Sequence, residues 1–110
     1  MVTMHGFFDL KEGTDEADFK VAYDKFGDYL IESHMITGYK AMRRSYHHGY
    51  DSKAPETRFY ISMDFADLAQ ANGCWDFIEE RRADSHGLHV DVYAQITNAS
   101  FFLSEDIPPA

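Results

Sequence analysis

Apolar residues recur at spacings of three and four between residues 15 and 33, which predicts one long amphipathic helix early in the chain. Thr14 precedes it as a candidate N-cap, and Asp15 and Glu16 place negative charge in the first turn, where the helix dipole favours it. The stripe consists of Phe19, Ala22, Tyr23, Phe26, Tyr29 and Leu30. Gly27 costs about 1 kcal/mol relative to Ala inside a helix, so we expect it to mark a close approach to a sheet.

Four other segments have the composition and the period of two that are typical of β-strands. These predicted strands span residues 2–10, 39–48, 58–65 and 99–106. The second of them carries Lys40, Arg43 and Arg44, and such charge suits an edge strand because it discourages unwanted pairing. A loop over residues 49–57 joins the second strand to the third, so these two strands are expected to form a hairpin.

A second helix is predicted after Asp67, which can cap it while Gln70 completes a capping-box pattern. The apolar stripe of this helix consists of Leu68, Ala71, Trp75 and Ile78. A break is possible at Asn72-Gly73, and the single cysteine, Cys74, is expected to be a small packed hydrophobe. Residues 85–93 mix His, Gly and Val, which predicts one turn of helix followed by an irregular segment.

The resulting order is strand, helix, strand, strand, helix, strand, which is the ferredoxin-like βαββαβ pattern of the α+β class. It predicts a four-stranded antiparallel sheet with the helices on one face. The other face still carries Phe and Tyr residues, which indicates a second subunit against it. A chain of 110 residues is expected to form a single domain over residues 1–110.

The acidic composition narrows the range of partners. A net charge of −9 disfavours nucleic acid and anionic membrane surfaces, since both would be repelled. One cysteine allows no intrachain disulfide and no metal-thiolate cluster, so we expect no metal site. No signal peptide and no apolar run long enough for a bilayer is evident, which predicts a soluble cytoplasmic protein.

Two short motifs carry a resemblance to a known superfamily. The first is a strand with His5, then a charged turn with Gly13 and Thr14, then an acidic helix start. The second is His86-Gly87-Leu88-His89 after the second helix, followed closely by a closing strand at residues 90–93. With these motifs, most of the chain resembles the dimeric α/β-barrel superfamily, including the stress-responsive A/B-barrel proteins.

This resemblance implies two subunits packed sheet to sheet, with small and often aromatic ligands between sheet and helices. Members include plant polyketide cyclases, muconolactone isomerases, haem-degrading monooxygenases and many proteins with no known activity. In the cyclases a His of the His-x-x-His motif is the base and a first-strand His lies in the pocket, which implies these roles for His89 and His5. The haem-degrading branch uses an Asn on the first strand, a Trp on the second helix and a His shortly after it; Trp75 and His86 match two of these three positions, and the first strand has no Asn.

The same residues also allow purely structural roles in place of catalytic ones. His86 and His89 would share one face of a helix and could transfer protons near neutral pH, or one could cap a helix and the other be solvated. Trp75 is expected to pack in the core rather than to form the wall of a cofactor site. Asp9 and Asp64 could share a lumen as an acid–base pair, although we favour salt bridges to Arg43, Arg44 or Arg58.

Three hypotheses follow. The first is a homodimer that binds a small apolar or aromatic molecule and uses proton-transfer chemistry if it is an enzyme, as in a cyclase, isomerase or lyase. His89 would be the base and His5 or His86 its orienting partner. The residues expected to contact the ligand are Phe7, Trp75, Asp9 and Tyr93. The second is haem binding or oxidation with His86 as axial ligand. The third is a non-enzymatic dimer without a pocket large enough for a ligand.

Overall fold

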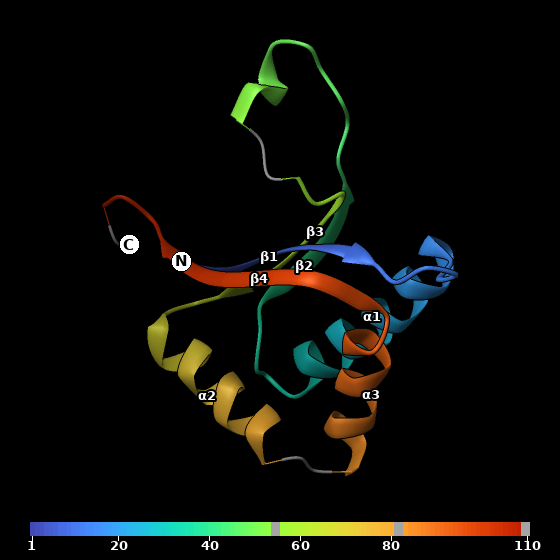
Figure 1. Ribbon diagram of the computed structural model, residues 1–110. Helices are drawn as coiled ribbons and strands as arrows, with labels where there is room; N and C mark the ends of the chain where they lie inside the picture. The colour runs from blue at the N-terminus through green and yellow to red at the C-terminus, as the bar shows by residue number, and fades with distance from the viewer. Residues whose placement is uncertain (54–55, 81–82, 109–110) are drawn as a thin grey trace.

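A computed structural model of the protein describes residues 1–53, 56–80 and 83–108. Figure 1 shows one sheet with the α-helices all on the same side of it. The elements are β1 (Val2–Leu10), α1 (Glu16–Glu32), β2 (Gly38–Arg43), β3 (Phe59–Phe65), α2 (Leu68–Glu79), α3 (Ala83–Tyr93) and β4 (Ile96–Glu105). The strand order is β2-β3-β1-β4 and every neighbouring pair is antiparallel. The predicted α+β order is confirmed, with α3 as an added helix.

The sheet has two faces with different surroundings. Register places His5 of β1 opposite Ser62 of β3 and opposite Phe102 of β4, so these three residues share one face. We call this the open face, because the helices lie on the other side (Figure 1). On the face beneath the helices, which we call the covered face, Phe8 is fully buried and Ile61 is buried beside it in the core.

Helix α1 packs closely against β2, as the glycine in its interior predicts. A Cβ at Gly27 would lie 2.5 Å from the ring of Tyr39, so no larger residue fits without a shift of that ring. The Tyr39 hydroxyl donates a hydrogen bond to Asp28 Oδ1 at 2.7 Å. This contact therefore pins the second half of α1 to the edge strand.

Both ends of α1 are capped. The N-cap is Asp15, not Thr14 as predicted, because the Asp15 carboxylate accepts a hydrogen bond from the Ala17 backbone N at 2.7 Å. At the other end His34 adopts a left-handed backbone with φ of 59°. The backbone N of Met35 then donates to the Leu30 carbonyl at 2.9 Å, which ends the helix in a Schellman-type turn.

The second strand is shorter than predicted. β2 lies at the sheet edge as expected, but it ends at Arg43, and the chain then rises on the open-face side before returning to β3 (Figure 1). The ring of Tyr46 lies against the guanidinium carbons of both Arg44 and Arg58, at 4.9 and 4.8 Å from the ring centroid. This stacking holds the first residues of the connection in place. Because β2 ends at Arg43, His47 and His48 lie outside any strand, and their predicted strand positions are wrong.

The two later helices also differ from the prediction. α2 is capped by Asp67, whose carboxylate accepts from the Gln70 backbone N at 2.8 Å, and it runs unbroken through Gly73. Its buried side centres on Ala71 and Cys74, whereas Trp75 is 66% exposed, so the predicted core position of Trp75 is wrong. Residues 83–93 form the regular helix α3, not one turn followed by an irregular segment, so residues 90–93 do not belong to the closing strand as the resemblance implies. The closing strand spans Ile96–Glu105, where 99–106 was predicted. In the described ranges, no helix has both the length and the apolar character needed to cross a bilayer.

Candidate functional site

A groove of about 340 Å³ lies between the end of α2 and one side of α3. Its lining includes Ile78, Glu79, His86, His89, Val90 and Tyr93. The α3 residues in this set are three or four positions apart, so a regular helix brings them to one side. Three of the candidate site residues, His86, His89 and Tyr93, therefore meet here because α3 is helical along its full length.

His89 is the half-buried group of this groove. Its ring lies 5.6 Å from the Phe26 ring and 5.7 Å from the Tyr93 ring, measured between centroids. Burial lowers the pKa of His89 below its ordinary value, and the nearby His86 lowers it further, while Glu79 acts in the opposite sense. The imidazole is therefore neutral near pH 7 and has a free lone pair for a proton.

His5 is held in a separate cluster on the open face. Its Nδ1 lies 2.6 Å from the Tyr60 hydroxyl and its Nε2 lies 2.6 Å from Ser104 Oγ. The ring stacks on Phe102 at 4.9 Å, and Phe7 lies 5.2 Å from the Tyr60 ring. These five residues, His5, Phe7, Tyr60, Phe102 and Ser104, form what we call the open-face cluster.

The sheet separates the two groups. Phe8, the neighbour of Phe7, points into the core with Phe26, and Phe26 contacts His89 on the helical side. His5 therefore does not orient His89, because the two imidazoles lie on opposite sides of the sheet. Trp75 does not line the groove that holds His86, and its side chain is mostly exposed.

The acidic candidates on the strands are held by neutral donors. Asp9 accepts hydrogen bonds from the Arg58 backbone N at 2.9 Å and from Asn98 Nδ2 at 3.2 Å. Asp64 accepts from the Thr3 hydroxyl at 3.0 Å, near the other end of the open face. The favoured salt bridges to these carboxylates are absent from the described residues, and the two carboxylates do not form a pair.

Neither the cysteine nor any cluster of metal-ligand residue types offers a further reactive group in the part of the chain that the structure describes. Cys74 is buried in α2 as expected, and burial raises the pKa of its thiol to about 11, so it remains protonated at neutral pH. Within the ranges that the structure describes, no three His, Cys, Asp or Glu residues are grouped so that they could hold a metal ion.

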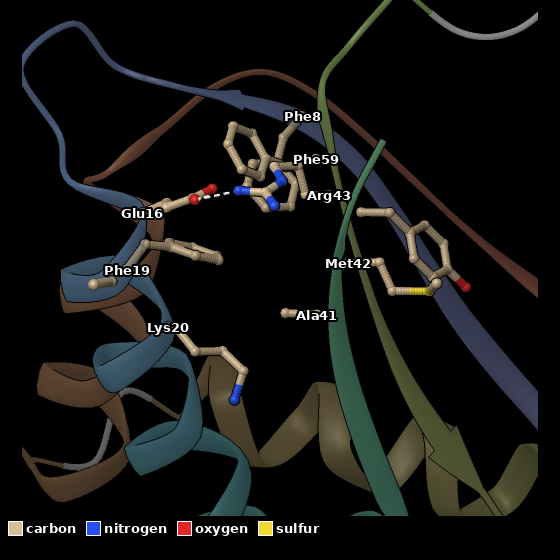
Figure 2. Close-up of a pocket in the computed structure, with 10 residues that line it drawn as sticks. Phe8, Glu16, Phe19, Lys20, Ala41, Met42, Arg43 and Phe59 are labelled. Carbon is tan, nitrogen blue, oxygen red and sulfur yellow. Dashed lines mark hydrogen bonds and ion pairs between the residues drawn. The ribbon is translucent and has the colours of Figure 1, made fainter. Parts of the chain in front are cut away.

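A second hollow of about 460 Å³ lies between α1 and β2, and sequence reasoning missed it (Figure 2). It is open where Ala17 of α1 and Ala41 of β2 leave room between the helix and the strand. Small residues on two facing elements are the signal that could have found it, although the pairing of α1 with β2 is not visible in the sequence. The partners of His5 were missed for the same reason, since Tyr60 and Ser104 are distant in the chain.

Comparison with solved structures defines the class of fold. A crystal structure of an Arabidopsis thaliana protein has a TM-score of 0.75 and 4% identity, and the match covers 96% of this chain and 95% of that one. A dimeric ferredoxin-like protein of unknown function from Jannaschia has a TM-score of 0.66 and 10% identity, covering 96% of this chain and 98% of that one. The fold is therefore the ferredoxin-like fold of such dimeric proteins.

The family is defined by the sequence. Residues 1–110 match the family of unknown function DUF6614, and the chain belongs to that family. A mutant of SnoaB, a cofactor-independent oxygenase from Streptomyces nogalater, shares the fold with a TM-score of 0.68 at 10% identity, over 96% of this chain and 91% of that one. The search of curated proteins finds no match.

Proposed function

We propose that this protein is a homodimer that binds a small apolar or aromatic molecule in the α2–α3 groove, with His89 as the general base of a proton transfer. The half-buried, neutral His89 between two aromatic rings carries the proposal. A base must be unprotonated at the working pH to accept a proton, and burial keeps it so. The volume of about 340 Å³ falls in the range of roughly 300–1,000 Å³ that is typical of small-ligand sites.

The neighbours of His89 fit this role. Ile78 and Val90 supply apolar surface for the body of a ligand, and the Tyr93 ring adds an aromatic wall. Once His89 takes a proton, the resulting cation is stabilised by the Glu79 carboxylate, which favours the charged form. The groove thus combines an apolar binding surface with a base and a counter-charge, as proton-transfer chemistry requires.

The test uses 2-tetralone, a small aromatic ketone whose α-protons exchange with deuterium when a base removes them. Mass spectrometry in D₂O near pH 7 should show exchange faster than in buffer with the wild-type protein, and the His89→Ala variant should lose this acceleration. The exposed loop residue His48 provides the matched control, and His48→Ala should exchange like wild type. Equal rates for His89→Ala and wild type, or no acceleration by wild type, would contradict the proposal.

The open face supports the homodimer. Phe102 is 52% exposed and Met42 is 54% exposed on it, which leaves apolar surface on the side without helices. Ser62 Oγ is buried there without a hydrogen-bond partner among the described residues. The dimeric ferredoxin-like protein from Jannaschia, which shares the fold, is consistent with a second copy against this face.

Light scattering after size-exclusion chromatography tests the dimer. Wild type should have twice the mass of the chain, and Phe102→Glu should elute as a monomer because it places a charge within the apolar contact. Val21 is 54% exposed on α1, on the helical side, so Val21→Glu is a control of equal exposure that should remain dimeric. A monomeric wild type, or a dimeric Phe102→Glu, would exclude the open face as the interface.

A further inference from the structure

We propose that the hollow between α1 and β2 is a second ligand site, distinct from the His89 groove, and that it takes a small aromatic monocarboxylate. The hollow lies beside the first half of α1, the last residues of β2 and the start of β3. Its residues are not shared with the groove at α3, because the two linings have no member in common. The site therefore goes beyond the proton-transfer function.

The hollow exists because α1 contacts β2 through two pairs of residues, Gly27 with Tyr39 and Glu16 with Arg43, and a gap is left between these contacts. The Gly27–Tyr39 contact closes one end, where the helix touches the strand. The Arg43 guanidinium and the Glu16 carboxylate form an ion pair across the other end, which Figure 2 shows as a dashed line. Between these ties the side chain of Ala41 is too short to reach the helix, so a space remains.

The inner wall of this space is aromatic. Phe8 and Phe19 pack with their ring centroids 5.1 Å apart, and Phe59 stacks on Phe8 at 5.8 Å. Phe59 is only partly buried, so part of an aromatic surface is left for a ligand ring. A flat aromatic molecule suits this wall because stacked or tilted ring pairs are favoured beyond the burial of their surface.

Two basic side chains lie at the mouth of the hollow. Arg43 comes from β2 and Lys20 from α1, and Figure 2 shows the Lys20 side chain extending from the helix toward the strand. Each is paired with an acidic residue of α1, Arg43 with Glu16 and Lys20 with Asp24. The Glu16 carboxylate thus occupies the position on Arg43 that a ligand carboxylate would take.

Replacing Glu16 by a ligand carboxylate costs little. The Arg43 and Glu16 side chains are about half exposed, at 57% and 48%, and ion pairs between exposed side chains contribute little to stability because water competes for both charges. A guanidinium offers two parallel N–H donors to a carboxylate, so the exchange keeps the charge-assisted hydrogen bonds of Arg43. The net charge of −9 disfavours polyanions, which selects a single carboxylate over a di- or triphosphate.

The experiment is a titration with 2-naphthoate, followed through the backbone amide signals of ¹⁵N-labelled protein. Signals of Ala17, Lys20, Ala41 and Arg43 should shift together and saturate with one common midpoint, whatever the signals of Val90 and Ala94 at the other groove do. The neutral analogue 2-naphthalenemethanol has the same ring system without the carboxylate, and it should bind at least about tenfold more weakly. Equal affinity for the two probes, or shifts confined to the α3 groove, would overturn the site.

Two variants should change the naphthoate affinity in opposite directions. Arg43→Gln removes the carboxylate partner and should weaken binding by about tenfold. Glu16→Gln removes the competing carboxylate and should tighten binding several-fold. Lys25→Gln and Asp18→Asn make the same charge changes at exposed α1 positions outside the hollow. Lys25→Gln should weaken naphthoate binding less than Arg43→Gln does, and Asp18→Asn should tighten it less than Glu16→Gln does. If Arg43→Gln binds like wild type, or if Asp18→Asn tightens binding as much as Glu16→Gln, no specific carboxylate site exists.

Discussion

The covered and open faces of the sheet use alternate residues of the same strands, but they are built from different chemistry. Beneath the helices, Phe8, Ile61 and Met63 are buried in a continuous apolar core. On the open face, His5 is bonded to hydroxyl groups on both neighbouring strands, and aromatic rings surround it. The centre of the covered face is buried beneath helices of this chain, whereas the open face combines directed polar contacts with exposed rings.

This difference separates two ways of stabilising a sheet. Apolar packing beneath α1 removes side-chain surface from water within one chain. The stability it contributes depends on the volumes of these side chains and on how closely they pack together. On the open face the His5 ring nitrogens are hydrogen-bonded within the chain, whereas Ser62 Oγ has no partner among the described residues, and exposed rings remain that a second subunit could cover. Substitutions of the same type on the two faces should therefore have unequal effects on the free energy of unfolding.

The largest contrast is expected between two adjacent phenylalanines. Phe8→Ala should lower the free energy of unfolding by about 3–5 kcal/mol, because Phe8 is fully buried on the covered face. Phe7→Ala on the open face should cost much less in urea unfolding at low protein concentration, where a dimer would dissociate. Equal losses for the two variants would break the distinction between the faces.

Two glycines on the helices that form the covering layer make the next contrast. Gly27→Ala should destabilise the protein, because the new Cβ would lie 2.5 Å from the Tyr39 ring. A Cβ at Gly73 would meet no atom within 4 Å, so Gly73→Ala should stabilise α2 through helix propensity. Thermal unfolding of both variants should show a difference of about 2 kcal/mol. If both variants gain stability, α1 is not tightly packed on β2.

A smaller contrast concerns two tyrosine hydroxyls. The Tyr23 hydroxyl donates to the Ser62 carbonyl at 2.8 Å in the core, so Tyr23→Phe should cost about 1 kcal/mol. Tyr60→Phe removes the hydroxyl beside His5 on the open face, where water can take its place, and should cost less at low protein concentration. A larger loss for Tyr60→Phe under these conditions would show that the open-face network carries monomer stability.

The smallest effect on stability is expected from a change of pH, which acts on His89 of α3 in the helical layer. Burial lowers the pKa of His89, so the unfolded chain binds more protons than the native state once the pH falls below about 6.5. His89 therefore reduces native stability progressively as the pH falls through its lowered native pKa. Relative to a His89→Leu variant, wild type should lose stability from about pH 7 to about pH 5 in urea unfolding. A difference that is constant with pH would contradict the burial of His89.

Much of the fold was predictable because its signals are local. The limits of β1 are those that the sequence predicts, and Asp67 and Gln70 cap α2 through contacts three residues apart. Trp75 shows where periodicity stops being sufficient, because it lies within the predicted stripe of α2 and is nevertheless exposed. Only the placement of that helix on the sheet buries Ala71 and Cys74 and leaves Trp75 exposed.

The candidate site was less predictable for the same reason. Gly87, Val90 and Val92 weaken the local preference of α3 for a helix, and Leu88 and Val92 instead bury its inner side against the core. His86, His89 and Tyr93 were recognised as individual residues, but their common groove depends on this packing. The position of His5 across the sheet from them depends on strand facing, which the resemblance could not supply.

Residue types at short spacing decided where most strands and helices of this protein lie, since capping, periodicity and turn residues act within a few positions. The sequence also indicated that the face of the sheet opposite the helices would carry Phe and Tyr side chains. Only the tertiary structure decided which histidines share a site, how Tyr60 and Ser104 meet His5, and that a hollow opens between α1 and β2. Those outcomes depend on contacts between residues tens of positions apart, whose energies are settled by packing and register rather than by local preference.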